Sequence, residues 1–156
     1  MFRKIEYTLE TDKGRGAVID PENIYRYLSI AAPYLELVEE MTALEFLLFH
    51  QRFKPLIASV SIEEILSIID LGKSAGKQIR YFSSGMKQRL KLAQAVFADV
   101  PVLLLDEPCT NLDTNGYQLY HDLLANYCTG KLVIISSNDE LEIDTCSERL
   151  NILDYK

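Results

Sequence analysis

The sequence is poor in the features on which extracellular and membrane-embedded proteins depend. Its three cysteines are an odd number and lack the spacing of metal ligands, which disfavours a disulfide framework and a zinc site. No apolar run approaches the roughly 18 residues of a membrane-spanning helix, and the first residues lack the apolar core and cleavage site of a signal peptide. We therefore expect a cytoplasmic chain in which Cys109, Cys128 and Cys146 are free thiols, buried or half-buried.

Positive charge is scarce as well. The 16 basic side chains face 23 acidic ones, which gives a formal net charge of -7. Such a charge repels a phosphate backbone unless basic residues cluster strongly, so we expect no nucleic acid partner. The 156 residues, 48% of them hydrophobic, suffice for one core that buries roughly two-thirds of the surface of the unfolded chain.

The phosphate-binding pattern G-x-x-x-x-G-K-[ST] does not occur in the 156 residues. The nearest match is Gly72-Lys73-Ser74, but Ser67 stands where the first glycine belongs. In such loops backbone donors and the lysine cradle the phosphates. We therefore interpret this segment as unrelated to a phosphate loop, and we expect no tight ATP binding by this chain alone.

Local patterns predict a ribbon followed by two helices. Residues 4–9 alternate between polar and apolar side chains, glycines at 14 and 16 mark a turn, and residues 27–30 begin a further strand of this antiparallel ribbon. Thr42 and Ser61 each stand three residues before a glutamate and ahead of an apolar run, which is the pattern of a capping box. Two helices are predicted between about 42 and 78, with a break at Pro55.

The second half of the chain predicts alternating helices and buried strands. A serine pair at 83 and 84 precedes apolar residues at helical spacing at 86, 90, 93 and 97. Continuous apolar runs at 102–105 and 132–135 flank a helical segment with Tyr117, Tyr120, Leu124 and Tyr127 on one side. Such runs are typical of parallel strands in an α/β layer. An alternating run at 150–154 predicts one more strand at an edge.

Two adjacent carboxylates, Asp106 and Glu107, come directly after the apolar run at 102–105. Ligands of open α/β sheets bind at this end of the strands. Paired acids in an apolar setting are costly to keep ionised, so a cation or a proton-transfer task is the natural compensation. In a nucleotide site the first acid would orient Mg²⁺ and the second would polarise the attacking water. The alternative is a strand that ends in a solvated acidic turn.

Ser83, Ser84 and Gly85 stand at the predicted start of a helix, with basic residues in its first turns. Free backbone N–H groups, the positive end of the helix dipole and a glycine that permits close approach together make an anion site. An ordinary serine-capped helix fits these residues equally well.

The order of these parts distinguishes the alternatives. A serine–glycine turn, an amphipathic helix, an apolar strand, Asp-Glu-Pro and Thr110-Asn111-Leu112-Asp113 follow one another. This order closely resembles the C-terminal portion of an ABC transporter ATP-binding subunit, from about residue 28 to the end. The resemblance implies an α/β fold, namely a partial P-loop NTPase layer with parallel core strands and a small helical subdomain.

The resemblance also implies roles for the two motifs. Ser83 and Gly85, with Ser84 between them, match the signature motif, which contacts the terminal phosphate of ATP held by the opposing subunit of a head-to-tail dimer. Phe82, Ser84 and Met86 depart from the usual letters of that motif.

Asp106 matches the Walker B aspartate that serves Mg²⁺, Glu107 matches the catalytic glutamate, and Asp113 lies in the D-loop that meets its counterpart across the dimer. The resemblance thus implies ATP and Mg²⁺ as cofactors of the complete subunit. Two positions depart from the family: Pro33 stands where a glutamine senses the γ-phosphate, and Asn138 where the switch histidine stands. An amide can donate a hydrogen bond but cannot carry the proton of an imidazole, so we expect slow hydrolysis.

The resemblance divides the chain into three regions. Residues 1–39 are expected to be a residual strand region with an altered glutamine loop, residues 40–80 a helical subdomain that docks on a membrane-spanning subunit, and residues 81–156 the signature, Walker B, D-loop and switch region. The phosphate loop and its strand would precede Met1. We therefore expect the Walker B strand to have an unpaired parallel edge and the chain to be unstable unless completed. The subunit would lie at the inner face of the cell membrane, held by its partner.

The expected function is ATP binding and hydrolysis that drive dimerisation and move a membrane partner. A catalytically inactive interaction module or degenerate subunit is the alternative, favoured by the missing loop, Pro33 and Asn138. A DNA-maintenance or ribosome-associated ATPase of the same superfamily is disfavoured because the sequence has no long heptads and no excess of basic charge. The sequence indicates neither the transported substrate nor the direction of transport.

Overall fold

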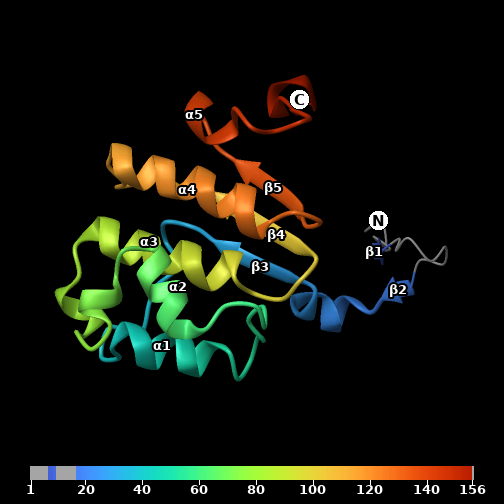
Figure 1. Cartoon of the computed structure of the whole chain (residues 1–156). Coiled ribbons are helices and arrows are strands. Elements are labelled where there is room, and N and C mark those ends of the chain that lie inside the picture. The colour runs from blue at the N-terminus through green and yellow to red at the C-terminus, as the bar shows by residue number, and fades with distance from the viewer. Residues whose placement is uncertain (1–6, 10–16, 156) are drawn as a thin grey trace.

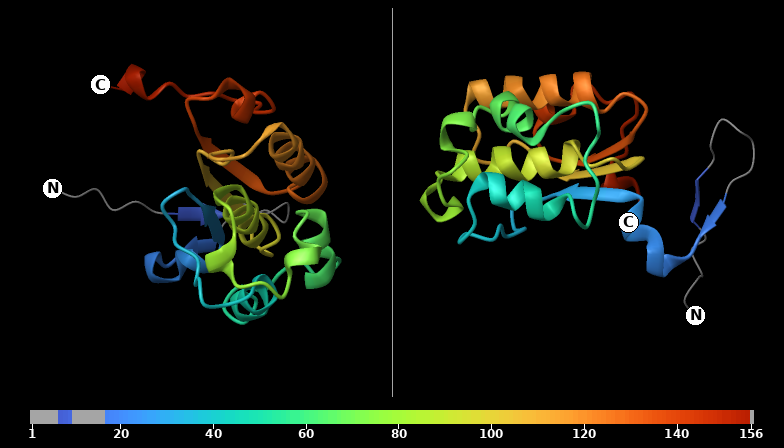
Figure 2. Two further views of the ribbon diagram at one scale, coloured as in Figure 1. Left: turned by 90° about the vertical axis from the view of Figure 1, so that its left-hand side faces the viewer. Right: turned by 60° about the horizontal axis from the view of Figure 1, so that its bottom comes forward.

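A computed structural model describes residues 7–9 and 17–155 of the chain. Its centre is a three-stranded parallel sheet, and helices α3 (Ser84–Val96) and α4 (Thr114–Tyr127) lie on the same side of that sheet (Figure 1, Figure 2). The α/β fold with parallel core strands is therefore confirmed. Since parallel neighbours need a crossover connection, the helical segments occur where the chain returns to the start of the next strand.

The strand order is β3 (Leu28–Ala31), β4 (Val102–Asp106) and β5 (Leu132–Ser136), with β4 in the middle. The expectation that the strand ending in Asp106 has an unpaired edge was wrong, because β3 pairs with one side of β4 and β5 with the other. The outer strands are β3 and β5. Strand neighbours are set by contacts between distant parts of the chain, which a local pattern does not reveal.

One face of the sheet is packed against α3 and α4. Side chains at the odd-numbered positions of β4, Leu103 and Leu105, are buried there together with Ala31 of β3. The hydroxyl of Ser29 donates to the Ala95 carbonyl of α3 at 2.8 Å within this layer. The core therefore fixes α3, and with it the serine–glycine turn, against the sheet.

The two predicted helices are α1 (Ala43–His50) and α2 (Ile62–Ile68), and both predicted capping boxes are present. In each box the hydroxyl of Thr42 or Ser61 accepts from the N3 backbone, while the N3 glutamate accepts from the cap backbone at 2.8 Å. Short 3-10 helices at Gly72–Ser74 and Ile79–Tyr81 lead on to α3. Local hydrogen bonding determines where these helices begin.

The N-terminal prediction was right in part. Strands β1 (Tyr7–Leu9) and β2 (Ala17–Ile19) pair antiparallel, whereas the predicted turn at Gly14 and Gly16 and residues 4–6 lie outside the described residues. The segment at 27–30 does not extend that ribbon, because β3 pairs parallel with β4. Small side chains explain why this segment joins the parallel sheet, since Ser29 and Ala31 are small enough to be buried between β4's neighbour strand β3 and α3.

The predicted edge strand at 150–154 was wrong. The chain instead forms α5 (Glu140–Ile143) after β5 and a 3-10 helix at Ile152–Tyr155. The side chain of Asn151 accepts from the Leu153 backbone at 3.0 Å, and its carbonyl accepts from the Asp154 backbone. An asparagine that bonds to the backbone two residues ahead favours a turn over an extended strand.

The cysteines agree with the prediction. Cys109 and Cys128 are buried, Cys146 is half-buried, and all three are free thiols. Of the helices that the structure describes, none is long and apolar enough to cross a membrane.

Candidate functional site

Two cavities open where the C-terminal ends of β4 and β5 meet the loops that follow them. The first, of about 570 Å³, lies between the loop after β4 and the segment at 137–142, and the second, of about 540 Å³, lies at the start of α3. Asn111 and Leu112 line both cavities and form the wall between them. The end of the sheet that the sequence predicted to bind a ligand therefore carries two separate hollows.

Asp106 is the last residue of β4 and lies opposite Ser136 of β5. Its Oδ2 accepts a hydrogen bond from the phenol of Tyr34 at 2.9 Å. This bond raises the pKa of the Tyr34 phenol, because the neighbouring carboxylate stabilises the protonated form. No local pattern predicts this contact, since 72 residues separate the partners.

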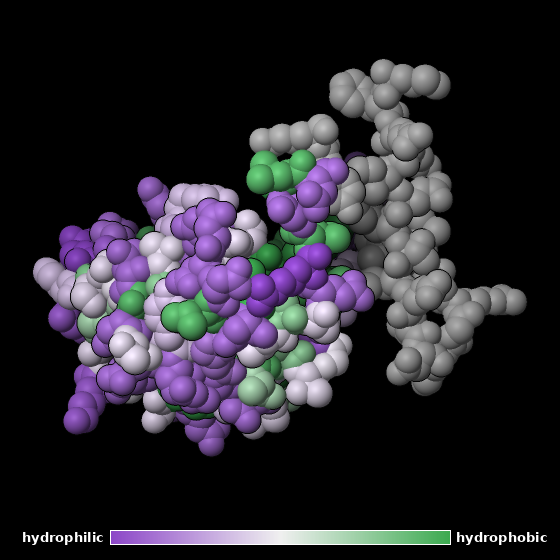
Figure 3. Space-filling view, turned by 90° about the horizontal axis from the view of Figure 1, so that it is seen from above, coloured by the Kyte–Doolittle hydropathy of each residue, from purple (hydrophilic) through white to green (hydrophobic). Residues whose placement is uncertain are grey.

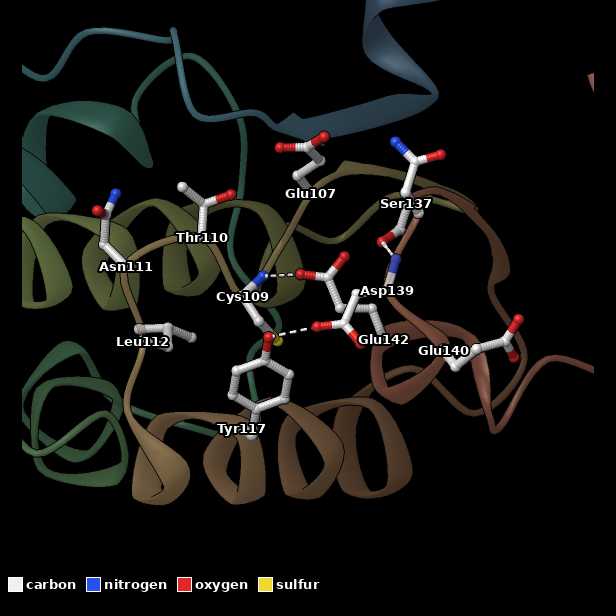
Figure 4. A pocket seen from close by; sticks show the side chains of 11 residues that line it. Glu107, Cys109, Thr110, Asn111, Leu112, Tyr117, Ser137, Asp139, Glu140 and Glu142 are labelled. Atoms are coloured by element: carbon white, nitrogen blue, oxygen red, sulfur yellow. Dashed lines mark hydrogen bonds between the residues drawn. The ribbon is translucent and has the colours of Figure 1, made fainter.

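Glu107 lies at the first cavity in a left-handed backbone conformation, with φ of 41°. Its N–H donates to the Ser136 carbonyl at 2.9 Å, and its carbonyl accepts from the Thr110 N–H at 3.1 Å. These bonds turn the chain sharply after β4 and leave the carboxylate exposed at the cavity (Figure 4). Asn138, from the loop after β5, lines the same cavity, so the structure brings these two predicted residues together.

The wall of the first cavity is built around a buried carboxylate, Glu142, which is only 3% exposed. Its Oε1 accepts from the Cys109 backbone at 2.7 Å, and its own carbonyl accepts from the phenol of Tyr120 at 2.8 Å. Oε2 has no hydrogen-bond partner among the described residues. Burial and the Glu142 carboxylate raise the pKa of the Cys109 thiol, which is therefore protonated.

A second contact closes the same wall. The Tyr117 phenol of α4 donates to Asp139 Oδ2 at 2.6 Å (Figure 4). That hydrogen bond lowers the pKa of Asp139, since it favours the ionised carboxylate. Together with Glu142, this pair ties the segment after β5 to α4 and to the turn after β4.

The second cavity is lined by the start of α3. Ser83 is the N-cap and its hydroxyl accepts from the Met86 N–H at 3.2 Å, while Ser84 and Gly85 form the first helical residues. A Cβ atom at Gly85 would lie 3.1 Å from the carbonyl oxygen of Asn111. Glycine is needed here because the helix start and the Asn111 backbone approach so closely.

Charged side chains surround the helix start. Arg89 bonds to Asp70 at 3.2 Å and to Asp113 at 3.4 Å, and its side chain is only 16% exposed. Asp113 also caps α4, accepting from the Gly116 N–H at 2.8 Å. Lys73 lines the cavity and forms no ion pair with any described residue. The cavity thus combines free helix N–H groups with two cations, Lys73 and Arg89, and two carboxylates, Asp70 and Asp113.

The structure therefore groups the predicted site residues in two sets. Glu107 and Asn138 line the first cavity, and Ser83, Ser84, Gly85 and Asp113 line the second. Asp106 lines neither and lies beneath Tyr34.

Three residues at the site were not predicted from the sequence. Tyr34 and Glu142 carry no local pattern that marks them. Lys73 was set aside with Ser74 as part of a false phosphate loop, yet both residues line the cavity at Ser83.

The donor set at Asp106 limits the kind of metal that fits. No group of three or more acidic, histidine or cysteine side chains that could hold a metal ion exists among the described residues. Mg²⁺ is commonly bound through one or two carboxylates together with substrate phosphates. A single carboxylate at the end of β4 therefore fits an Mg²⁺ ion that arrives with a polyphosphate, and does not fit a metal held by protein side chains alone.

Comparison with known proteins gives consistent results. Residues 14–110 match the family described as "ABC transporter". The chain is 35% identical over 127 residues to the uncharacterised ABC transporter ATP-binding protein all4389 of Nostoc, a match that covers 78% of this chain and 37% of that protein. It is 30% identical over 143 residues to the uncharacterised ABC transporter ATP-binding protein YhcH of Bacillus subtilis, covering 88% and 42%. The chain thus spans less than half the length of these relatives.

Solved structures share the fold. A structure of an ATP-binding subunit of an ABC transporter superposes with a TM-score of 0.66 at 21% identity, covering 83% of this chain and 59% of the other. An inward-facing metal-chelate type ABC transporter superposes with a TM-score of 0.58 at 15% identity, covering 83% and 54%.

Proposed function

The chain belongs to the ABC transporter family, among its ATP-binding subunits, and on that premise we propose that it provides the signature and hydrolytic residues of an ATPase that drives a transporter. The observation that carries the proposal is the pair of cavities on either side of Asn111 and Leu112. The first cavity has the exposed Glu107 carboxylate, and the second has the start of α3 with Lys73 beside it. Such a division suits a subunit that contacts two nucleotides, one on each side of this wall.

The second cavity is proposed to bind the terminal phosphate of an ATP held by an opposing subunit. The N–H groups of Ser84 and Gly85 have no acceptor within the helix, and the helix dipole adds positive potential at this end. Lys73 lies at the same cavity without a carboxylate partner among the described residues. Asp113 is held by Arg89 and by the cap of α4, so it can meet the opposing subunit in a fixed position.

Asp106 and Glu107 are proposed to act on the nucleotide of the same subunit. Asp106 would hold Mg²⁺, which neutralises charge on the phosphates when bound. Glu107 is exposed at the cavity and its turn is fixed by two backbone hydrogen bonds, so its carboxylate can accept a proton from an attacking water. Asn138 can donate its amide to a phosphate oxygen but cannot take up a proton, which supports slow turnover.

The helical region from α1 to Tyr81 is proposed to dock on a membrane-spanning subunit. Phe49 near the end of α1 and Phe53 just after it pack edge to face with ring centroids 4.9 Å apart, and Phe53 is 72% exposed. Exposed aromatic pairs favour contact with a partner surface.

A degenerate subunit without turnover is the second candidate. Two observations favour it, namely Asn138 at the first cavity and the engagement of Asp106 by Tyr34. In that case nucleotide binding would persist while hydrolysis would be absent.

Hydrolysis separates the two candidates. We would measure binding of a fluorescent ATP analogue with Mg²⁺ to the 156-residue chain and to the chain extended by a strand and a G-x-x-x-x-G-K-[ST] loop. The proposal expects weak binding by the first, and binding with slow hydrolysis by the second. Glu107→Gln should abolish that hydrolysis and leave binding intact. Binding without hydrolysis, unchanged by Glu107→Gln, would select the degenerate subunit, and no binding by the extended chain would refute both.

A further inference from the structure

Asp70, just after the end of α2, has a backbone conformation that an aspartate seldom adopts. Its φ is 58°, in the left-handed region that glycine enters without strain and that other residues enter rarely. The Asp70 N–H donates to the Ser67 carbonyl at 3.0 Å, and the Leu71 N–H donates to the Leu66 carbonyl at 2.7 Å. These two bonds form a common motif at helix ends, in which glycine is the usual residue at this position. Asp70 is therefore strained, and strained residues concentrate at functional sites.

The left-handed turn places a carboxylate at the second cavity. Asp70 lines that cavity, and its Oδ2 accepts from Nη1 of Arg89 at 3.2 Å. The Asp70 side chain is 90% exposed, and Arg89 is its only hydrogen-bond partner among the residues that the structure describes. The ion pair with Arg89 is thus the contact that holds this carboxylate.

Arg89 is shared between two carboxylates. Its Nη1 bonds to Asp70 and its Nη2 to Asp113 at 3.4 Å, and its side chain lines the second cavity. A guanidinium binds a phosphate most strongly through two parallel N–H bonds from its planar fork. Because both terminal nitrogens already serve carboxylates, a phosphate that takes up the end of this fork must displace one of them.

Asp70 is the carboxylate that can leave. Asp113 also accepts from the Gly116 N–H at 2.8 Å, so its departure would uncap α4. Asp70 has a single ion pair on a nearly fully exposed side chain, and pairs of this kind contribute little to stability because solvent screens them. The end of the molecule to which the parallel strands point is mostly hydrophilic, at the left of Figure 3, so water can solvate the released carboxylate there.

We propose that Asp70 is an internal counter-ion of the second cavity, which competes with an incoming phosphate for Arg89 and so limits the affinity of the cavity for anions. A bound phosphate displaces Asp70, takes up Arg89 and leaves Asp113 at the cap of α4. Asp70 belongs to neither of the two motifs in the sequence. The inference rests on the proposed function, because it concerns the regulation of the same phosphate site.

This displacement links the phosphate site to the helical region. Asp70 follows α2, whereas Arg89 belongs to α3, so their ion pair ties the end of one helix to the other. A phosphate that takes up Arg89 releases this tie. Since α2 lies in the region proposed to dock on a membrane-spanning subunit, the occupancy of the phosphate site is passed to that region through Asp70.

The test titrates tripolyphosphate into the 156-residue chain by isothermal titration calorimetry. Asp70→Asn removes the charge and keeps a residue that tolerates the left-handed conformation, and Asp70→Gly removes the whole side chain. Both should bind about three- to tenfold more tightly than the wild type, because an exposed ion pair no longer competes and a nearby negative charge is gone. Glu63→Gln, at the start of α2 and outside the cavity, changes the net charge equally and should alter the affinity less than about twofold.

A second measurement separates competition for Arg89 from a simple loss of negative charge. In nuclear magnetic resonance spectra recorded without any ligand, the side-chain Nε–H signal of Arg89 should differ between the wild type and Asp70→Asn. In the wild type this signal should also shift over the same tripolyphosphate concentrations as the Gly85 amide. In an Arg89→Gln background, Asp70→Asn should lose most of its effect on affinity.

The outcomes distinguish this inference from the proposed phosphate site. Equal affinity of the wild type and Asp70→Asn, or a gain that persists unchanged in the Arg89→Gln background, would overturn the inference and leave the site intact. So would an Arg89 signal that is the same in the wild type and in Asp70→Asn, since the ion pair would then not form in solution. Absence of binding by every variant would instead refute the phosphate site, and this inference with it. Circular dichroism checks that the variants are folded; if Arg89→Gln is not, the Arg89 signal decides.

Discussion

The phenol of Tyr34 donates a hydrogen bond to Asp106 at 2.9 Å and so joins the segment after β3 to the end of β4. Tyr34 directly follows Pro33, which the resemblance to the family predicts to stand at the position of the γ-phosphate-sensing glutamine. The contact occupies Oδ2 of the carboxylate that we propose for Mg²⁺. We propose that Tyr34 acts on this carboxylate where the family uses an amide sensor.

Removal of that phenol should change the Mg²⁺ dependence of nucleotide binding. In Tyr34→Phe both Asp106 oxygens become available, so we expect a chain completed with a phosphate loop to reach half-saturation at a several-fold lower Mg²⁺ concentration. Mg²⁺ titrations of a fluorescent ATP analogue measure this effect, and Tyr81→Phe, at another exposed tyrosine, is the control. An unchanged Mg²⁺ dependence would show that the contact has no part in cation binding.

Gly85 should tolerate no β-branched side chain. A Cβ atom would lie 3.1 Å from the Asn111 carbonyl, so Gly85→Val pushes the wall between the two cavities away from α3. We expect anion binding at the second cavity to fall at least tenfold, a loss of about 1.4 kcal/mol, as measured by calorimetric titration with tripolyphosphate. Gly76→Val, where no atom lies within 4 Å of the new Cβ, should bind normally.

Glu142 should stabilise the turn after β4 through the hydrogen bond that its side-chain oxygen accepts from Cys109, rather than through its negative charge. Glu142→Ala leaves the Cys109 N–H buried without a partner, which costs about 1–3 kcal/mol. Glu142→Gln keeps an acceptor oxygen and also offers an amide in place of the unpartnered Oε2, so its stability should equal or exceed that of the wild type. Urea unfolding monitored by circular dichroism compares the three proteins. A similar loss in both variants would contradict this assignment.

Stability should fall in acid because of the two capping boxes. Backbone and hydroxyl donors at Thr42 and Ser61 lower the pKa of Glu45 and Glu64 from their ordinary value of 4.5. Between the folded and unfolded values the unfolded chain binds more protons, so this stabilisation is complete above pH 4.5 and is lost as the pH falls through the folded pKa. Urea midpoints from pH 7 to pH 3 measure the loss. The double variant Glu45→Gln with Glu64→Gln retains the caps and should show a smaller decline.

The parts that could be predicted from the sequence are those with local causes. The helix starts at Thr42 and Ser61 depend on side chains three residues away, and the serine–glycine turn and the Asp106–Glu107 pair follow directly from motif and strand pattern. The parts that were missed depend on contacts between distant segments. The position of β3 beside β4 is one such case, and the contact of Tyr34 with Asp106 is another.

The error at the C-terminus has a different cause. The alternation at 150–154 predicts a strand, but the chain forms a 3-10 helix because Asn151 bonds to the backbone ahead of it. An exposed segment with no partner strand among the described residues gains nothing from extension. Side-chain bonding to the backbone decides its conformation instead.

Nuclear magnetic resonance of the 156-residue chain can test whether the start of α3 is a phosphate site. In a titration with tripolyphosphate, the amide signals of Ser84 and Gly85 should shift with saturable dependence on concentration, with an affinity on the order of millimolar. Lys73→Ala should weaken binding several-fold, whereas Lys77→Ala, a lysine that does not line the cavity, should not. If these amides do not respond, or if both lysine variants bind like the wild type, the start of α3 is an ordinary capped helix and the proposed phosphate site does not exist.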